Sequence, residues 1–128
     1  TTYDRKTDSV KPLSPSADVD IVYYFMTSAR CPSCMKIEAF TKEAVQNNFT
    51  DYLKDGRIEW HIVQVDKPEN RHFIKDYQLY TKSVVLVKIR NGEEVNWKNL
   101  ERVWQLLYDK NDFQAYISQE VKSFIEKG

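Results

Sequence analysis

The chain is poor in glycine. Its three glycines, Gly56, Gly92 and Gly128, are far apart. Loops that cradle phosphate groups and dinucleotide fingerprints both need closely spaced glycines. The sequence therefore shows no site for a nucleotide, flavin or nicotinamide, and we expect the protein to carry no cofactor.

Net charge and long apolar runs are also missing. Nineteen Lys and Arg residues balance nineteen Asp and Glu residues, so bulk electrostatics gives no reason to expect nucleic acid or an anionic membrane as a partner. No apolar run approaches the length of about 18 residues that a membrane span needs. Hydrophobic residues make up 41% of the 128 residues, which is enough to bury the core of one domain.

Cysteine is equally scarce, and both cysteines lie in one motif, Cys31-Pro32-Ser33-Cys34. The motif follows the apolar run Ile21-Val22-Tyr23-Tyr24-Phe25-Met26, which is typical of a buried strand. Two thiols at this spacing form a dithiol that can close to a disulfide and reopen. Such a pair exchanges two electrons.

An amphipathic helix is expected directly after the motif. Its apolar positions recur at helical spacing: Ile37, Phe40, Ala44, Val45, Phe49, Tyr52 and Leu53. This pattern makes Cys31 the N-cap, Pro32 the first helical residue and Cys34 the third.

The expected helix start assigns different roles to the two thiols. Unpaired N–H groups of the first turn, the helix dipole and the neighbouring Arg30 all favour a thiolate at Cys31. A thiol in such a setting has a pKa of about 3.5 to 7.5 instead of about 8.5. We therefore expect Cys31 to be the exposed nucleophile and Cys34 the shielded thiol that resolves the mixed disulfide.

Two other interpretations of the cysteine pair stay open. The first is a structural disulfide, although closing so short a loop stabilises the fold by only about 2 kcal/mol. The second is a zinc site, for which the chain offers only His61, His72 and carboxylates as further ligands. We expect no metal, because zinc needs four ligands and there is no second cysteine pair.

The rest of the chain divides into a leader and one domain. Residues 1–18 are polar, contain prolines and lack periodicity, so they predict a flexible leader or linker before a domain over 19–128. The domain is expected to run as a strand (21–27), a helix (34–52), a strand (57–66), a short helix (69–77) and a strand (83–90). A turn at Asn91-Gly92 then leads to a short strand (93–97).

Two helical stretches are expected after Trp97. Leu100, Val103, Trp104 and Leu107 mark the first stretch. The second begins after Asp109 and contains Phe113 to Ile125. The second and third strands are rich in β-branched residues and nearly continuous in apolar character, so we expect both to be central in the sheet.

This order of elements, with the cysteine motif between the first strand and helix, resembles the thioredoxin fold. The resemblance spans about residues 19 to 127 and includes Val65-Asp66 and Asn91-Gly92-Glu93. It implies an α/β fold with a central mixed β-sheet flanked by helices and with an extended helical C-terminus. Pro32 within the motif is similar to the glutaredoxin and DsbA pattern.

Four stretches resemble a small bacterial thioredoxin-like family, labelled nitrophenyl compound nitroreductase subunit, ArsF family. They are residues 30–34, 69–73, 76–83 and 97–104. The label implies reduction of nitro groups, whereas the residues themselves offer no nitroaromatic or flavin site. From this family we carry over the thioredoxin-like fold and the cysteine pair, and the substrate stays open.

Two positions depart from the thioredoxin pattern. Tyr24 and Phe25 stand where thioredoxins have a buried Asp, which leaves Asp66 or Lys88 as candidates for exchanging a proton with Cys34. Lys82-Ser83 stands where thioredoxins have a cis-proline before the third strand. We expect the Lys82–Ser83 peptide to be trans, and the loop to end within about 4.5 Å of a cysteine with a partly exposed Ser83 hydroxyl.

The sequence therefore predicts a thiol–disulfide oxidoreductase with Cys31 and Cys34 as catalytic residues. Arg30, Pro32, Ser33, Lys82 and Ser83 support them. The expected partner is a protein disulfide or dithiol, or a small-molecule disulfide. The alternative is a thioredoxin-fold binding module, such as an accessory subunit of a reductase, with no turnover of its own.

The compartment and the oligomeric state stay open. Because the sequence begins with Thr1 and not with Met, we expect that an upstream segment was removed, as either a signal peptide or part of a longer chain. Two cysteines behind a polar leader are typical of a bacterial periplasmic or exported protein. A cytoplasmic dithiol protein would look the same.

Overall fold

The computed structural model describes residues 18–127. Except for Asp18, the leader predicted over residues 1–18 lies outside the described residues. The leader and the domain boundary at residue 19 therefore stay predictions. Within the described residues, no helix is both long enough and apolar enough to cross a membrane.

A mixed sheet of four strands forms the centre of the described chain, in the order β2-β1-β3-β4. The strands are β1 (Val19–Met26), β2 (Ile58–Gln64), β3 (Ser83–Arg90) and β4 (Glu93–Asn99). β1 pairs with β2 in parallel, whereas the pairs β1–β3 and β3–β4 are antiparallel. The predicted mixed α/β sheet is confirmed.

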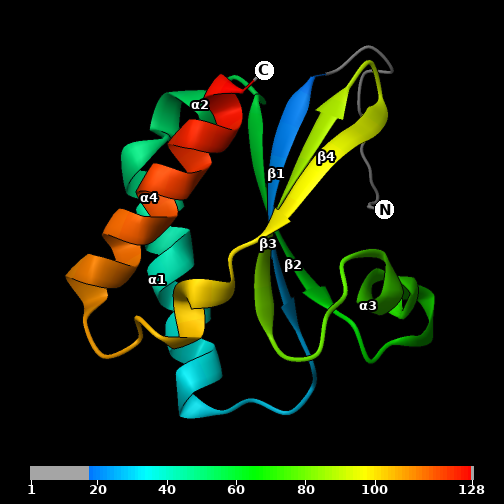
Figure 1. Cartoon of the computed structure of the whole chain (residues 1–128), viewed down its shortest axis with the longest axis vertical. Coiled ribbons are helices and arrows are strands. Elements are labelled where there is room, and N and C mark those ends of the chain that lie inside the picture. Colours follow the sequence, from blue (N-terminus) through cyan, green and yellow to red (C-terminus); the bar gives the residue numbers. More distant parts are fainter. Residues whose placement is uncertain (1–17, 128) are drawn as a thin grey trace.

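Helices cover both faces of this sheet (Figure 1). They are α1 (Pro32–Asn48), α2 (Thr50–Lys54), α3 (His72–Asp76) and α4 (Lys110–Glu126), with short 3-10 turns η1 (Pro68–Asn70) and η2 (Glu101–Trp104). α1 and α4 lie together on one face, and α3 lies on the other (Figure 1). The long α4 confirms the predicted helical C-terminus.

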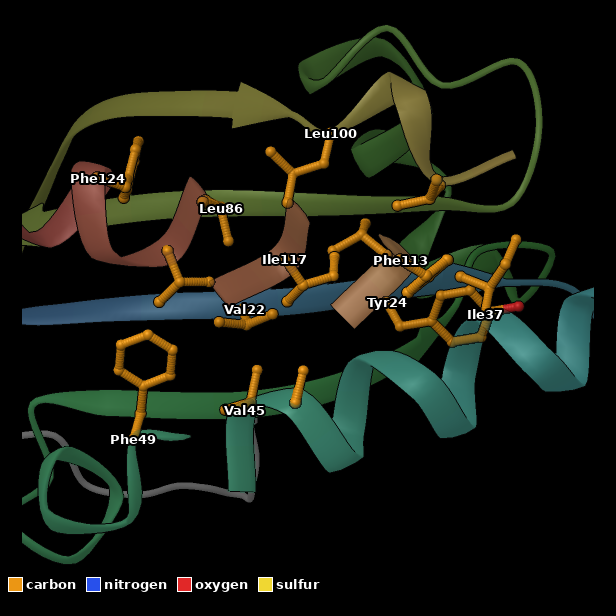
Figure 2. Close-up of a cluster of buried hydrophobic side chains, with 14 of the residues drawn as sticks. Val22, Tyr24, Ile37, Val45, Phe49, Leu86, Leu100, Phe113, Ile117 and Phe124 are labelled. Atoms are coloured by element: carbon orange, nitrogen blue, oxygen red, sulfur yellow. The ribbon is translucent and has the colours of Figure 1, made fainter. Parts of the chain in front are cut away.

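The central strand β1 contributes to both hydrophobic clusters because its side chains alternate between the two faces. Val22 and Tyr24 pack toward α1 and α4, and Figure 2 shows Tyr24 beside Ile37 and Phe113, with Val22 nearer Ile117. Phe25 packs on the opposite face with the aromatic residues that line α3. Burial on both sides explains why the strand is almost continuously apolar.

Predictions that depend on a few adjacent residues are confirmed. β3 has the predicted limits. The turn after it has positive φ at Asn91 (55°) and Gly92 (79°), as a two-residue type I′ hairpin requires. The Asp109 side chain caps α4 by accepting a hydrogen bond from the backbone N–H of Asp112 at 3.0 Å.

Three predictions about the elements are wrong. β2 is an edge strand of the sheet formed by the described residues, not a central one; it is apolar because it contributes to the hydrophobic clusters on both faces, with Ile58 on one and Val63 on the other. The predicted helix over 34–52 is interrupted at Phe49, where two asparagines and a threonine weaken helix propensity. The stretch after Leu100 forms only the 3-10 turn η2.

A buried ion pair lies near the beginning of β1. The Lys88 Nζ atom is 3.2 Å from Asp20 Oδ1, and the two side chains are only 4% and 10% exposed. Arg90 Nη1 approaches the same carboxylate oxygen at 3.4 Å. Since Asp20 and Lys88 face each other across the β1–β3 register, the pair joins two neighbouring strands.

Asp20→Asn should lower the free energy of unfolding by about 3 kcal/mol, because removing one partner of a buried pair leaves an uncompensated charge. Urea denaturation measures the change. Glu120→Gln is the matched control, since it breaks the more exposed pair with Lys98 and should cost less than about 1 kcal/mol. Equal losses in the two variants would contradict this account.

Candidate active site around the cysteine pair

The first turn of α1 is built around Cys31. Cys31 is the N-cap with extended backbone angles, φ −110° and ψ 159°, and Pro32 is the first helical residue. The Cys34 backbone N–H donates a hydrogen bond to Cys31 Sγ at 3.1 Å. The predicted cap is confirmed, and the helix start directs an N–H group at this sulfur atom.

The two cysteines differ in exposure. They are joined by a disulfide, with their Cα atoms 5.0 Å apart. Cys34 is only 2% exposed and belongs to the buried core, whereas Cys31 is partly exposed, as is Ser33, and Pro32 is exposed. An approaching thiol or disulfide can therefore reach Cys31 more readily than Cys34.

Arg30 precedes the N-cap and is itself paired. Its Nη2 atom donates to Glu38 Oε1 at 2.7 Å, and the two side chains are 40% and 23% exposed. Glu38 lies on α1 one helical turn after Cys34. The cation expected beside Cys31 is thus present, with a carboxylate bound to it.

Tyr24 occupies the buried position behind Cys34. Its hydroxyl donates a hydrogen bond to the Cys34 carbonyl oxygen at 2.9 Å. Burial raises the pKa of Tyr24 to about 12, and the charge on Glu38 adds to the increase. The phenol therefore stays protonated at neutral pH, where it acts as a hydrogen-bond donor and not as a base.

Asp66 holds the loop that carries the motif. Its Oδ2 atom accepts hydrogen bonds from the Ser28 backbone N–H at 3.0 Å and from the Ser28 hydroxyl at 2.8 Å. The backbone N–H of Ser28, followed by its hydroxyl, lowers the pKa of Asp66 to about 2. So acidic a carboxyl group is a poor proton acceptor for Cys34, and its evident role is to position the loop.

Lys88, the other candidate for exchanging a proton with Cys34, is remote from the site. It faces Asp20, the second residue of β1, whereas the cysteine loop follows the last residue of that strand. Because a strand rises about 3.4 Å per residue, most of the length of β1 lies between Lys88 and the cysteine loop. The structure places Lys88 in the buried pair with Asp20 and not beside Cys34.

The loop before β3 reaches the same end of the sheet as the cysteine loop, because Ser83 pairs with Phe25 near the end of β1. The expected partly exposed hydroxyl is not found: Ser83 is 5% exposed, and its Oγ donates to the Thr81 carbonyl at 2.8 Å. The Lys82 carbonyl accepts a hydrogen bond from Trp104 Nε1 at 2.8 Å. The trans peptide and the contact with a cysteine stay predictions.

A shallow pocket lies beside this loop. It is formed between the segment before β3 and the turn η2, and its lining includes Tyr80, Lys82, Ser83, Glu101 and Trp104. Tyr80 is 83% exposed. The pocket thus adds an aromatic and partly polar surface at the end of the sheet where the cysteine loop lies.

No metal-binding cluster is present in residues 18–127: these residues contain no group of three or more His, Cys, Asp and Glu side chains that could hold an ion. His61 Nε2 lies 2.8 Å from Glu59 Oε1 on the edge strand β2. His72 Nδ1 lies 2.8 Å from Asp76 Oδ2 on α3. Each histidine is therefore paired locally, within its own strand or helix.

Solved structures resemble the chain in fold. Trxlp from Edwardsiella tarda EIB202 matches with a TM-score of 0.50 and 13% identity, over 81% of this chain and 86% of that one. The protein has a thioredoxin-like fold. A Fasciola hepatica thioredoxin (TM-score 0.44, 20% identity, 79% and 80% covered) and thioredoxin O2 from Arabidopsis thaliana in the oxidized state (TM-score 0.44, 16% identity, 75% and 76% covered) are also similar.

Sequence comparison adds no family to this result. No protein family matches the chain, and no curated protein matches it. At these low identities the solved structures show the fold alone. The chemistry that the site itself offers is the opening and closing of the Cys31–Cys34 disulfide.

Sequence reasoning missed three residues of the site, namely Glu38, Ser28 and Trp104. A signal existed for Glu38, because residues four apart on a helix share a face and Glu38 follows Cys34 by four. The Ser28–Asp66 and Trp104–Lys82 contacts join residues 38 and 22 positions apart. No local pattern predicts contacts over such separations.

The Asp66 carboxyl should titrate at about pH 2 in the native protein instead of its ordinary 3.8. A depressed folded pKa contributes stability above the unfolded pKa, and this contribution is lost as the pH falls through the folded pKa. The stability that this contact contributes should therefore be complete at about pH 5 and decline between about pH 4 and 2, whereas in the folded protein the contact with Ser28 itself is lost only near pH 2. NMR of the Asp66 carboxyl carbon and the Ser28 amide measures both.

Ser28→Ala is the matched control, because it removes the hydroxyl donor and keeps the backbone N–H. The Asp66 midpoint should rise only part of the way toward its ordinary value. A midpoint near the ordinary value in the unchanged protein would show that Asp66 does not hold the loop.

Proposed function

We propose that the protein is a thiol–disulfide oxidoreductase that acts on protein disulfides, with Cys31 as the nucleophile and Cys34 as the resolving thiol. The observation that carries the proposal is the asymmetry of the pair at the start of α1. Cys31 is partly exposed and its Sγ accepts a backbone hydrogen bond, whereas Cys34 is buried. This arrangement suits one thiol for attack and the other for intramolecular release.

The reaction balances without a cofactor. The Cys31 thiolate attacks one sulfur of the substrate disulfide, which forms a mixed disulfide and releases the other sulfur as a thiolate that takes up a proton. Cys34 then loses its proton and attacks Cys31 Sγ, which releases the second substrate thiol. Two electrons and two protons pass to the substrate, and the protein ends as the Cys31–Cys34 disulfide.

Other residues of the motif and its neighbours support these steps. Pro32 fixes the first helical residue at no cost in hydrogen bonding, and Ser33 spaces the two thiols. Arg30 favours the thiolate form of Cys31. Lys82 and Ser83 shape the loop beside the pocket, where an extended peptide carrying the disulfide would lie.

The direction of electron flow, the compartment and the family are also parts of this proposal. A dithiol protein or a small thiol would return the disulfide form to the dithiol, and the reverse flow would make the protein an oxidant of substrate dithiols. We propose a bacterial periplasmic or exported setting, with the cytoplasm as the alternative. From the predicted resemblance to nitrophenyl compound nitroreductase subunits of the ArsF family we take only the dithiol chemistry.

The test is reduction of insulin by dithiothreitol, followed by turbidity, in the presence of the protein. The unchanged protein should accelerate the reaction, and Cys31→Ser should return it to the uncatalysed rate. Cys34→Ser should accumulate a mixed disulfide with its substrate, because the resolving thiol is missing. Mass spectrometry of the trapped species measures this.

Met35→Ser is the matched control. Met35 is 52% exposed in the same helical turn, and its thioether cannot exchange with a disulfide, so the variant should keep activity. If the unchanged protein reduces insulin no faster than Cys31→Ser, the fold serves as a binding module and the proposed chemistry is wrong.

A further inference from the structure

The ion pair between Arg30 and Glu38 connects the two sides of the cysteine motif. Arg30 immediately precedes Cys31, and Glu38 lies one helical turn beyond Cys34. Their side chains are joined at 2.7 Å and are partly screened from solvent, with Glu38 only 23% exposed. The pair is therefore held close to the dithiol by residues on both sides of it.

The position of Glu38 determines where the positive charge of Arg30 lies. Cys31 is the N-cap of α1, and Glu38 lies seven residues further, a rise of about 10 Å along the helix axis. The Glu38 carboxylate binds the guanidinium at 2.7 Å, so the charge of Arg30 is already paired and is partly neutralised next to the helix start, where Cys31 Sγ accepts its backbone hydrogen bond. In the disulfide form no thiolate competes for the cation.

Reduction of the disulfide to the dithiol changes the charges around Arg30. The dithiol form has an anion at Cys31, and the guanidinium then has two negative groups within reach. An opposite charge nearby lowers a thiol pKa, whereas a like charge raises it. Glu38 acts against the thiolate in both ways, because it binds the Arg30 cation and carries a negative charge of its own.

We propose that Glu38 is a positioning residue that lowers the reactivity of Cys31 and favours the disulfide form over the dithiol, by binding the Arg30 guanidinium that precedes the nucleophile. The effect on the Cys31 pKa stands on this geometry alone. Its consequence for turnover rests on the proposed thiol–disulfide exchange.

Other charged or titratable groups belong to the segments next to the motif. Tyr24 of β1 is protonated at neutral pH, since burial raises its pKa to about 12. Asp66 after β2 is bound to Ser28, Lys82 precedes β3, and Lys36 lies exposed on α1. None of them is hydrogen-bonded to Arg30 or Glu38 in the described contacts, although the charges of both residues act on Tyr24, and none is changed in the variants below.

The first experiment measures the Cys31 pKa from thiolate absorbance at 240 nm in a Cys34→Ser background. Glu38→Gln should lower the pKa by about half a unit to one unit, because it removes the like charge and releases Arg30. Arg30→Gln should raise it. In the Arg30→Gln background, the effect of Glu38→Gln should fall to less than about half.

The second experiment measures the equilibrium of the two-cysteine protein with reduced and oxidised glutathione at pH 7. The two-electron reaction is dithiol plus oxidised glutathione to disulfide plus two reduced glutathione molecules. A stabilised thiolate favours the dithiol, so Glu38→Gln should lower the equilibrium constant about threefold to tenfold. A tenfold change is about 30 mV toward a more oxidising potential.

Glu43→Gln is the matched control on the same helix. Glu43 pairs with Lys110 at 3.2 Å, and it is twelve residues from Cys31, about 18 Å along the helix. Beyond a Debye length of about 8 to 10 Å its charge is screened. The variant should leave both the Cys31 pKa and the glutathione equilibrium unchanged.

The outcomes separate this inference from the proposed function. An unchanged pKa and equilibrium constant in Glu38→Gln, or equal shifts in Glu43→Gln, would overturn the role of Glu38 even if the protein reduces insulin. A shifted pKa in a protein that does not reduce insulin would support the role of Glu38 and overturn the proposed function. A loosened helix start would raise the Cys31 pKa, because the N–H groups there favour the thiolate, so the predicted fall in the pKa distinguishes the proposed role from a structural loss.

Discussion

The hydrogen bond from the Cys34 backbone N–H to Cys31 Sγ is the contact on which the site depends. It exists because Cys31 caps α1 and Pro32 fixes the next residue. In the same turn Cys31 is partly exposed and Cys34 is buried. The sheet buries β1 on both faces, and this strand anchors the beginning of the cysteine loop.

Two further contacts keep this turn in place. The Tyr24 hydroxyl binds the Cys34 carbonyl from beneath the helix, and Asp66 binds Ser28 in the loop before it. Neither side chain is suited to accept a proton at neutral pH: the pKa of Tyr24 is raised and that of Asp66 is lowered. Tyr24 and Asp66 thus keep the cysteine turn in position, and the charges that bear on Cys31 are those of Arg30 and Glu38.

Local signals predicted much of the fold and of the site. The cap at Cys31, the limits of β3 and the Asn91-Gly92 turn each depend on a few adjacent residues, and all are confirmed. The position of β2 at the sheet edge depends on which strands pair, which apolar character alone does not determine. The predicted partial exposure of Ser83 is wrong, because its bond to Thr81 and its burial beside the loop arise only in the folded chain.

The central claim is that the fold makes the two thiols unequal, and alkylation of the fully reduced protein tests it most directly. Limiting iodoacetamide near neutral pH, followed by fragment mass spectrometry of the peptide that contains both cysteines, gives the two rates separately. The account predicts that Cys31 reacts at least about tenfold faster than Cys34, because only its sulfur is both exposed and stabilised as a thiolate. Equal rates, or a faster reaction at Cys34, would contradict it.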